Sequence, residues 1–353
     1  MEKISLTDLI RSQFYIFQII GFSPFSIGHY LDYKPLKWIN LYVFAHIVLQ
    51  STLAIYGVIQ PNVYDRYKNS VIGSDNIADI FQVLLVRSTR LVILIESLYR
   101  QKEQIEVLQK FTRIDSIFAD KFNVNINTKK IKFTIWICFL SLCASYSFCQ
   151  FMFCIGFVRG NEIEYTWFWL MYISSDITLA FRYFQINILI WCIKIRIEKL
   201  NKLLEEFCGL DVYYSALWPK NKNKSSLGLA DYNLKSTPKF GKYEKVNGFK
   251  GVSEKLNILR ELHHSLWQAT ELVNKCFGVS VICLILAASV SVIIDYYYLI
   301  IHVKLEKDFL VSIASFFWAF SHVFNIIAFC SLCHHTVLQV RLYSYSNFVY
   351  KFY

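Results

Sequence analysis

The stretch LNILRELHHSLWQATELVNKCFGVSVICLILAASVSVIIDYYYLIIHV, residues 256–303, decides the fold. Its first part is apolar at helical spacing and charged or polar between, which predicts an amphipathic helix packed on protein. The apolar positions are Leu256, Leu259, Leu262, Leu266, Ala269 and Val273. Residues 276–294 then hold no charged side chain, and a helix of that length crosses the ~30 Å hydrocarbon core of a bilayer. The stretch therefore predicts one helix that begins in water and enters a membrane.

The composition of the whole chain agrees with this interpretation. Its 353 residues are 55% hydrophobic and 17% aromatic, and the mean hydropathy is +0.36. Such values are typical of an all-α bundle of helices that crosses a membrane several times. The ten cysteines lie in or beside the apolar runs, whereas a secreted disulfide framework would place them in loops. A cleavable signal peptide is not predicted either, because Asp8 precedes the short apolar run at residues 14–22 and no A-x-A site follows it.

Six apolar runs predict six membrane spans. They cover residues 38–59, 77–98, 133–158, 166–193, 276–303 and 309–333. Residues 1–37 precede them and predict a short amphipathic helix at the membrane interface, followed by a turn at residues 21–25. Between spans, residues 99–132 are interpreted as a basic loop. Residues 194–275 form a long loop whose beginning, 195–207, continues a helical stripe beyond the membrane.

Charged residues inside the second span require a protein or water environment. This run contains Asp79, Arg87, Arg90 and Glu96, and a charge near the middle of a membrane costs several kcal/mol when it faces lipid. The helix should therefore face the bundle interior. Two hypotheses remain for Arg87: an internal pair or snorkelling side chain, and a position at a water-filled ligand cavity.

The distribution of Lys and Arg predicts how the chain sits in the membrane. Residues 1–37, 99–132, 194–275 and 334–353 together hold 29 of them, while the alternate connections hold five. Cytoplasmic segments carry this excess, so the N-terminal segment, the long loop and the tail at 334–353 should be cytosolic. The net charge of +11 is thereby explained without a nucleic-acid partner.

The chain resembles the insect gustatory receptors, which are related to the insect odorant receptors. One shared feature is the Gly21-x-x-Pro24 turn before the first span. A second is the passage Leu272-Val273-Asn274-Lys275-Cys276-Phe277-Gly278 into the fifth span, and a third is the end of that span at Asp295-Tyr296-Tyr297. The fourth is the topology with a cytosolic N-terminus. The resemblance extends over nearly the whole chain.

This resemblance implies a ligand-gated cation channel in the plasma membrane. Such channels assemble as homo- or heterotetramers surrounded by lipid, and their cytosolic helix extensions form a central anchor. A small-molecule tastant binds in the outer half of the bundle. The residues expected at that depth are Tyr146, Gln150, Trp169, Tyr172, Asp176, Asp295, Tyr296 and Trp318. The tyrosines that follow Asp295 are open to a second interpretation, an aromatic belt at the membrane interface.

One departure from the family concerns the pore. The family has a seventh span with a T-Y-x5-Q-F signature, and no such stretch is found among these residues. The sequence therefore predicts a chain that does not conduct alone. A truncated gene model, a splice variant and a degenerate gene are equally compatible with it.

Enzymatic and metal chemistry is not predicted. Cys330-x-x-Cys333-His334-His335 has metal-like spacing, but a closed zinc site needs four ligands and second-shell support. We interpret these residues, and the pair His263-His264, as ordinary residues of helices. The chain has no phosphate-binding loop, serine-hydrolase elbow or dinucleotide fingerprint, so no cofactor is expected.

Two other classes of membrane protein remain as alternatives. A G-protein-coupled receptor needs an extracellular N-terminus, and usually an acidic-Arg-aromatic triplet after its third span. A secondary transporter usually shows inverted repeats and helices broken by glycine. The basic segment here follows the second span, no repeat is found, and only twelve glycines occur. The channel subunit is therefore the favoured hypothesis.

Overall fold

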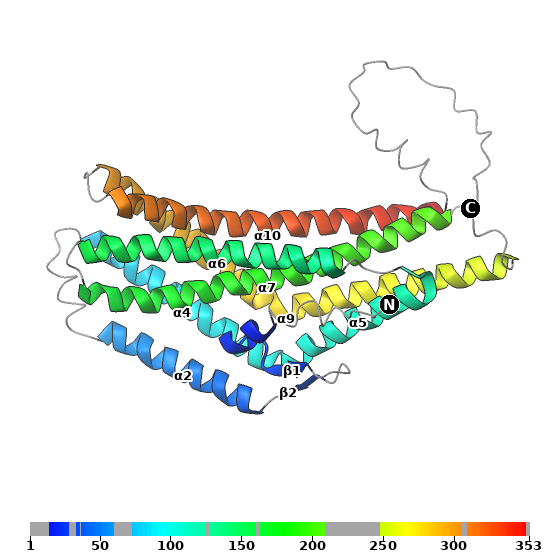
Figure 1. Ribbon diagram of the computed structural model, residues 1–353, viewed down its shortest axis with the longest axis horizontal. Helices are drawn as coiled ribbons and strands as arrows, with labels where there is room; N and C mark the ends of the chain where they lie inside the picture. Colours follow the sequence, from blue (N-terminus) through cyan, green and yellow to red (C-terminus); the bar gives the residue numbers. More distant parts are fainter. Residues whose placement is uncertain are drawn as a thin grey trace, which may run out of the picture.

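The computed structural model describes residues 14–27, 33–35, 37–59, 73–124, 128–159, 163–208, 248–304 and 309–350. Its long helices run along the longest axis of the molecule (Figure 1). They are α2 (Lys37–Ile59), α4 (Gly73–Tyr99), α5 (Gln101–Phe122), α6 (Thr128–Arg159), α7 (Ile163–Cys208), α9 (Gly248–Lys304) and α10 (Phe309–Tyr350). The predicted all-α fold is confirmed. Among the described residues, the exception is one short antiparallel pair of strands, β1 (Phe25–Ile27) and β2 (Tyr33–Pro35).

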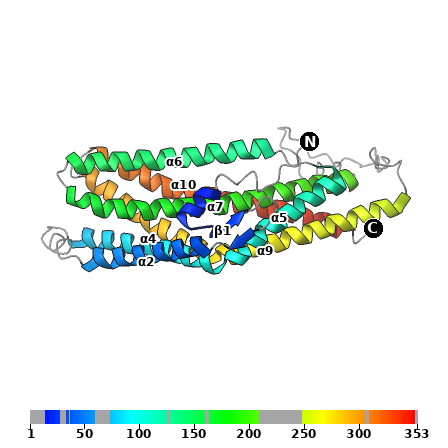
Figure 2. The same cartoon turned by 60° about the horizontal axis from the view of Figure 1, so that its bottom comes forward.

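Helix α9 is the centre of the bundle. It contains the whole stretch from which the fold was predicted, and it packs against α4, α5, α7 and α10 (Figures 1 and 2). The predicted amphipathic stripe is confirmed, since five of its six apolar positions are at most 7% exposed. These are Leu259, Leu262, Leu266, Ala269 and Val273. Burial of each leucine side chain stabilises the packing of α9 by about 2 kcal/mol.

Helices cover all six predicted spans, and several continue beyond them. The stripe predicted after the fourth span is confirmed, because α7 runs on to Cys208 with Ile197, Leu200 and Leu203 buried. Helix α10 continues through the segment assigned to the tail as far as Tyr350.

The basic loop predicted at residues 99–132 is wrong in its secondary structure. Residues 101–122 form the helix α5, which packs on the amphipathic first half of α9. Its buried stripe is Val107, Leu108, Phe111, Ile114 and Phe118. This helical spacing was present in the sequence, but the charges between these positions obscured it. Asn123 follows the last residue of α5 and caps the helix, with a left-handed backbone conformation (φ 52°) that is common at helix C-termini.

The outer surface of the bundle is apolar where lipid is expected. Four described segments are long and apolar enough to cross a membrane: Lys130–Met152, Ser174–Glu206, Glu254–Ile301 and Ser315–Val340. Large apolar side chains on these helices face outward, among them Ile282, Leu286, Ile293 and Ile327. A water-soluble protein rarely exposes so much apolar surface. The protein is therefore a multi-pass membrane bundle. Helices α2 and α4 are not among the four segments, so the number of spans stays a prediction.

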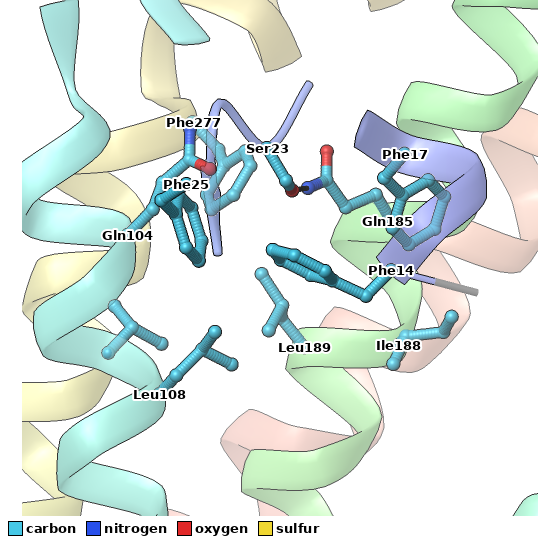
Figure 3. A pocket seen from close by; sticks show the side chains of 11 residues that line it. Phe14, Phe17, Ser23, Phe25, Gln104, Leu108, Gln185, Ile188, Leu189 and Phe277 are labelled. Carbon is cyan, nitrogen blue, oxygen red and sulfur yellow. Dashed lines mark hydrogen bonds between the residues drawn. The ribbon is translucent and has the colours of Figure 1, made fainter. Parts of the chain in front are cut away.

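The N-terminal segment, residues 14–27, packs against protein. Its phenylalanines 14, 17, 22 and 25 are at most 5% exposed. Phe14, Phe17 and Phe25 line a small space with residues of α5, α7 and α9 (Figure 3), and the backbone of the segment is seen beside these helices in Figure 2. The same helix also exposes Tyr15 and Ile19, so its position at the membrane interface stays a prediction. The turn at Gly21 explains the burial of the segment. Its φ of +94°, which glycine adopts without strain, reverses the chain and inserts Phe22 into the bundle.

Candidate functional site

Three of the four charged side chains in the second predicted span point into the bundle, as predicted, and the side chain of the fourth, Asp79, lies outside the described part of the chain. Arg87, Arg90 and Glu96 are all less than 9% exposed. The Arg90 guanidinium donates hydrogen bonds to Ser174 Oγ at 2.9 Å and to Ser175 Oγ at 3.3 Å, both on α7. Arg87 is buried in the same region, and the cavities described below are lined by other residues. For the described part of the chain, the geometry favours the internal position for Arg87.

The first buried polar group of the bundle, the Arg182 cluster, consists of Arg182, Glu96, Gln185, Ser280 and Ser23. Arg182 of α7 forms an ion pair with Glu96 of α4, with 3.0 Å between Nη2 and Oε2. It also donates to Gln185 Oε1 at 2.7 Å, and the Ser280 hydroxyl of α9 donates to Glu96. Because both charges are almost fully buried, the pair is stable only with these additional hydrogen bonds.

The N-terminal segment completes this cluster. Gln185 donates from Nε2 to Ser23 Oγ at 3.3 Å, the interaction drawn in Figure 3. The Arg182 guanidinium lies 5.3 Å from the ring centroid of Phe22 and 4.4 Å from that of Phe277, at distances typical of cation–π contact. The cavity that remains here is only ≈ 40 Å³ and mostly apolar, with Phe14 and Phe25 on its wall. We interpret these contacts as structural: they hold the N-terminal segment, α4, α7 and α9 together.

A second ion pair fastens α5 to α7. Arg196 forms two hydrogen bonds with the Asp115 carboxylate, Nε to Oδ1 at 2.9 Å and Nη2 to Oδ2 at 2.6 Å. The same guanidinium lies 4.6 Å from the ring centroid of Phe111. Burial raises the pKa of Asp115 above its ordinary value, and the positive charge of Arg196 opposes this rise. This bidentate geometry holds the two helices in register.

The second buried polar group, the Asp176 cluster, lies nearer the end of the bundle where α9 finishes and α10 begins. It contains Asp176 of α7, Asp295 of α9, His322 of α10 and Gln82 of α4, each at most 9% exposed. His322 Nε2 lies 3.8 Å from Asp176 Oδ1 and 4.0 Å from Asp295 Oδ2. Gln82 donates to Asp295 at 3.4 Å. Four helices thus direct polar side chains to one point.

Aromatic side chains cover one side of this cluster. The rings of Tyr146 on α6 and Trp318 on α10 meet edge to face with 5.8 Å between their centroids. Trp318 also contacts the His322 ring at 6.1 Å. Asn325 donates from Nδ2 to the Tyr146 hydroxyl at 3.3 Å, which fixes the tyrosine against α10.

Two adjoining spaces lie at this position. The inner chamber holds ≈ 10 Å³ and is lined by Asp176, His322, Tyr183, Ser291 and their neighbours. The second space, the α6–α10 groove, holds ≈ 920 Å³ between α6, α7 and α10. Tyr146, Ala180 and Asn325 line both spaces, so they form the boundary between them. A large apolar space with a few convergent polar groups is the usual form of a small-molecule site.

The structure brings together four of the eight residues predicted from depth alone. Tyr146, Asp176, Asp295 and Trp318 are buried and belong to the Asp176 cluster or its aromatic cover. Tyr296 is 44% exposed and lines neither space.

The remaining predicted residues are less well placed. Gln150 lies one turn beyond Tyr146 on α6 but lines neither space. Trp169 and Tyr172 are in α7, but their side chains lie outside the described part of the chain.

The sequence prediction missed three polar residues of the site: Gln82, His322 and Asn325. His322 was visible as the one histidine between Phe309 and Cys333, and Asn325 follows it at helical spacing. Each is a polar side chain in an apolar run, which is the signal that could have identified it. Gln82 carried no comparable signal, because charged neighbours on α4 dominated the interpretation of that helix. Among the described residues, no group of three or more His, Cys, Asp or Glu side chains that could hold a metal ion is found.

Comparison with known proteins decides the family. The sequence model described as 7tm chemosensory receptor matches residues 10–342, which is nearly the whole chain. The chain belongs to this chemosensory receptor family. Its receptors detect small molecules, in agreement with the apolar groove and its polar base.

A curated relative supports the same family. A Drosophila melanogaster protein that carries the name gustatory receptor 2a is 18% identical over 314 residues. The aligned part covers 85% of this chain and 67% of that protein. The resemblance to gustatory receptors is thereby confirmed, and the family is one of receptors, not of enzymes.

Proposed function

We propose that this protein is a gustatory receptor subunit of a ligand-gated cation channel in the plasma membrane of insect taste neurons. The observation that carries the proposal is the meeting of the α6–α10 groove with the Asp176 cluster. The groove contacts α6, α7 and α10, and the cluster adds α4 and α9. A ligand in this space therefore touches helices that must move relative to one another if a pore opens.

Ligand binding acts on such an equilibrium only through a difference in affinity. A small molecule that fits the groove better when α6 and α10 are in one arrangement shifts the population toward that arrangement. The anchor formed by α5 and the first half of α9 then serves as the fixed frame, because neither helix contributes a residue to the groove lining. Phe111 and Leu262, both fully buried, are examples of its packing.

Membrane orientation is part of the proposal. We infer that the N-terminus and residues 209–247 face the cytosol and that tetramers form through the anchor region. Epitope tags at residue 1 and within residues 220–224 should then stain only after cells are permeabilised. Staining of either tag on intact cells would reject the channel topology and favour a G-protein-coupled receptor.

Conduction is tested by recording from cells that express the full chain together with a second receptor of the family. Co-expression supplies a second subunit for the proposed tetramer. We expect tastant-evoked cation currents in these cells that are absent from cells expressing the second receptor alone. A matched variant, Phe320→Trp, narrows the groove and should reduce these currents without changing surface expression. Unchanged responses in this variant would contradict the groove as the ligand site.

A further inference from the structure

The inner chamber contains a buried carboxylate without hydrogen-bond donors. Asp176 is 1% exposed, and neither of its oxygens accepts a hydrogen bond from the described part of the chain. The nearest basic group is His322 Nε2 at 3.8 Å, which also has no hydrogen-bond partner among these residues. Burying a carboxylate that accepts no hydrogen bonds costs free energy. We therefore expect a bound molecule to supply the missing hydrogen-bond donors.

Among the described residues, no Lys or Arg lines the chamber. Arg90 donates to Ser174 and Ser175, and Arg182 is paired with Glu96. The chamber lining therefore holds one carboxylate, that of Asp176, beside one imidazole, that of His322. Asp295 does not line the chamber, and its carboxylate lies 4.0 Å from the same imidazole. The negative charge of the Asp176 carboxylate favours a positively charged ligand in the chamber.

The volume of the inner chamber limits the size of the ligand's charged head. A space of ≈ 10 Å³ accommodates about one water-sized group, such as the –NH₃⁺ head of a primary amine. The adjoining α6–α10 groove is far larger and is lined by Phe148, Phe317 and Phe320. A molecule with a small cationic head and an apolar body fits the two spaces together, whereas a bulky head does not.

The boundary between the spaces suits an ammonium group as well. Tyr146 lines both of them, and Trp318 packs against it edge to face. Aromatic rings attract cations at distances below about 6 Å. The Asn325 amide is oriented by its hydrogen bond to Tyr146, which leaves its carbonyl oxygen as a possible acceptor for an ammonium hydrogen.

We propose that the Asp176 cluster binds the ammonium head of a small primary amine whose hydrocarbon tail lies in the α6–α10 groove. This inference rests on the proposed ligand site and adds the chemical class of the ligand. Asp176 accepts hydrogen bonds from the head, and the phenylalanines of the groove pack against the tail. An alcohol with the same tail has the same packing but lacks the charge that the Asp176 carboxylate attracts.

The test uses the full chain purified in lipid nanodiscs and three probes with one tail: hexylammonium, 1-hexanol and hexyltrimethylammonium. Affinities are measured by titration of the intrinsic tryptophan fluorescence, because Trp318 lies beside the chamber. We expect hexylammonium to bind at least about tenfold more tightly than both other probes, a difference of about 1.4 kcal/mol. Asp176→Asn should remove this preference and leave the affinity for 1-hexanol unchanged.

Controls separate the site from general effects. Asp120→Asn neutralises an exposed aspartate on α5 and should retain the full preference for hexylammonium. Each variant is compared with wild-type protein in the same lipid, which accounts for partition of the probes into the bilayer. If Asp176→Asn does not fold, Asp295→Asn serves as the second variant, and it should reduce the preference in the same way.

The outcomes distinguish this inference from the proposed function. Equal binding of hexylammonium and 1-hexanol, unaffected by Asp176→Asn, would overturn the amine site while the groove remained a ligand site. Binding of sodium or potassium ions alone, dependent on Asp176, would replace the amine with an inorganic cation and also overturn it. If Phe320→Trp changes the affinity for none of the probes, the groove itself is rejected, and the proposed function fails with it.

Discussion

Two buried polar clusters lie on the same helix and differ in how their charges are satisfied. Arg182 and Asp176 are six residues apart on α7, so they point about 120° away from each other around the helix. Arg182 faces α4, α9 and the N-terminal segment, which supply an ion pair, hydrogen bonds and two aromatic rings. Asp176 faces α10 and a chamber, where hydrogen-bond donors from the described residues are lacking. A buried charge that the protein satisfies maintains structure, whereas one that it leaves open is available to a ligand.

Breaking the Arg182 cluster should have the largest effect on stability. Glu96→Ala leaves the Arg182 charge buried without its partner, and we expect a loss of about 3–5 kcal/mol. The measurement is the melting temperature and the monodisperse fraction of detergent-solubilised protein.

A double variant tests the cause of that loss. Replacing both charges, Glu96→Leu with Arg182→Met, removes the uncompensated charge and should recover most of the stability. If Glu96→Ala melts at the wild-type temperature, the ion pair does not maintain the fold, and the contrast between the two clusters is wrong.

The aromatic cover of the same cluster gives the next largest effect. Phe22 is fully buried and its ring lies beside Arg182, so Phe22→Ala should destabilise the protein by about 3–4 kcal/mol. Thermal unfolding in detergent measures the change. Tyr15→Ala is the control, because Tyr15 lies in the same segment but is 53% exposed, and its melting temperature should match that of the wild type. Equal loss in both variants would show that the whole segment, and not the insertion of Phe22, determines stability.

The sequence predicted much of this architecture and only part of the site. Helical periodicity identified α9 and the extension of α7, because buried leucines at three- and four-residue spacing have one simple interpretation. It failed for α5, where charges alternate with the buried stripe. Depth along the spans identified Asp176 and Asp295, but depth does not report which way a side chain points. Tyr296, next to Asp295, therefore proved exposed, and the convergence of Gln82 and His322 from separate helices required the structure.

The turn at Gly21 should be more sensitive than an ordinary glycine of the bundle. A Cβ atom there would lie 3.1 Å from both Leu94 Cδ2 and Val43 Cγ2, and the φ of +94° is strained for any other residue. We expect Gly21→Ala to cost about 1–3 kcal/mol in melting experiments. Gly278→Ala is the matched control: its Cβ would lie 3.6 Å from Asn274 Oδ1, and alanine should stabilise helix α9 by about 0.5–1 kcal/mol. The same sign of change in both variants would contradict the role of Gly21 in placing Phe22.

Asp176→Asn should have the smallest effect on stability of these variants, although we expect it to have the largest effect on ligand binding. Asp176→Asn and Glu96→Gln each replace a buried carboxylate with an amide of the same shape. Glu96→Gln weakens a charge-assisted pair with Arg182 and should cost about 1.5–3 kcal/mol. Asp176→Asn removes a charge that receives no hydrogen bond from the described residues, so the melting temperature should stay the same or rise. Sites shaped for a ligand commonly sacrifice stability in this way, and neutralising them recovers it. If Asp176→Asn instead destabilised the protein as much as Glu96→Gln, then Asp176 would be a structural residue whose donors the ligand-free chain already provides, and the chamber would have no need of a cationic guest.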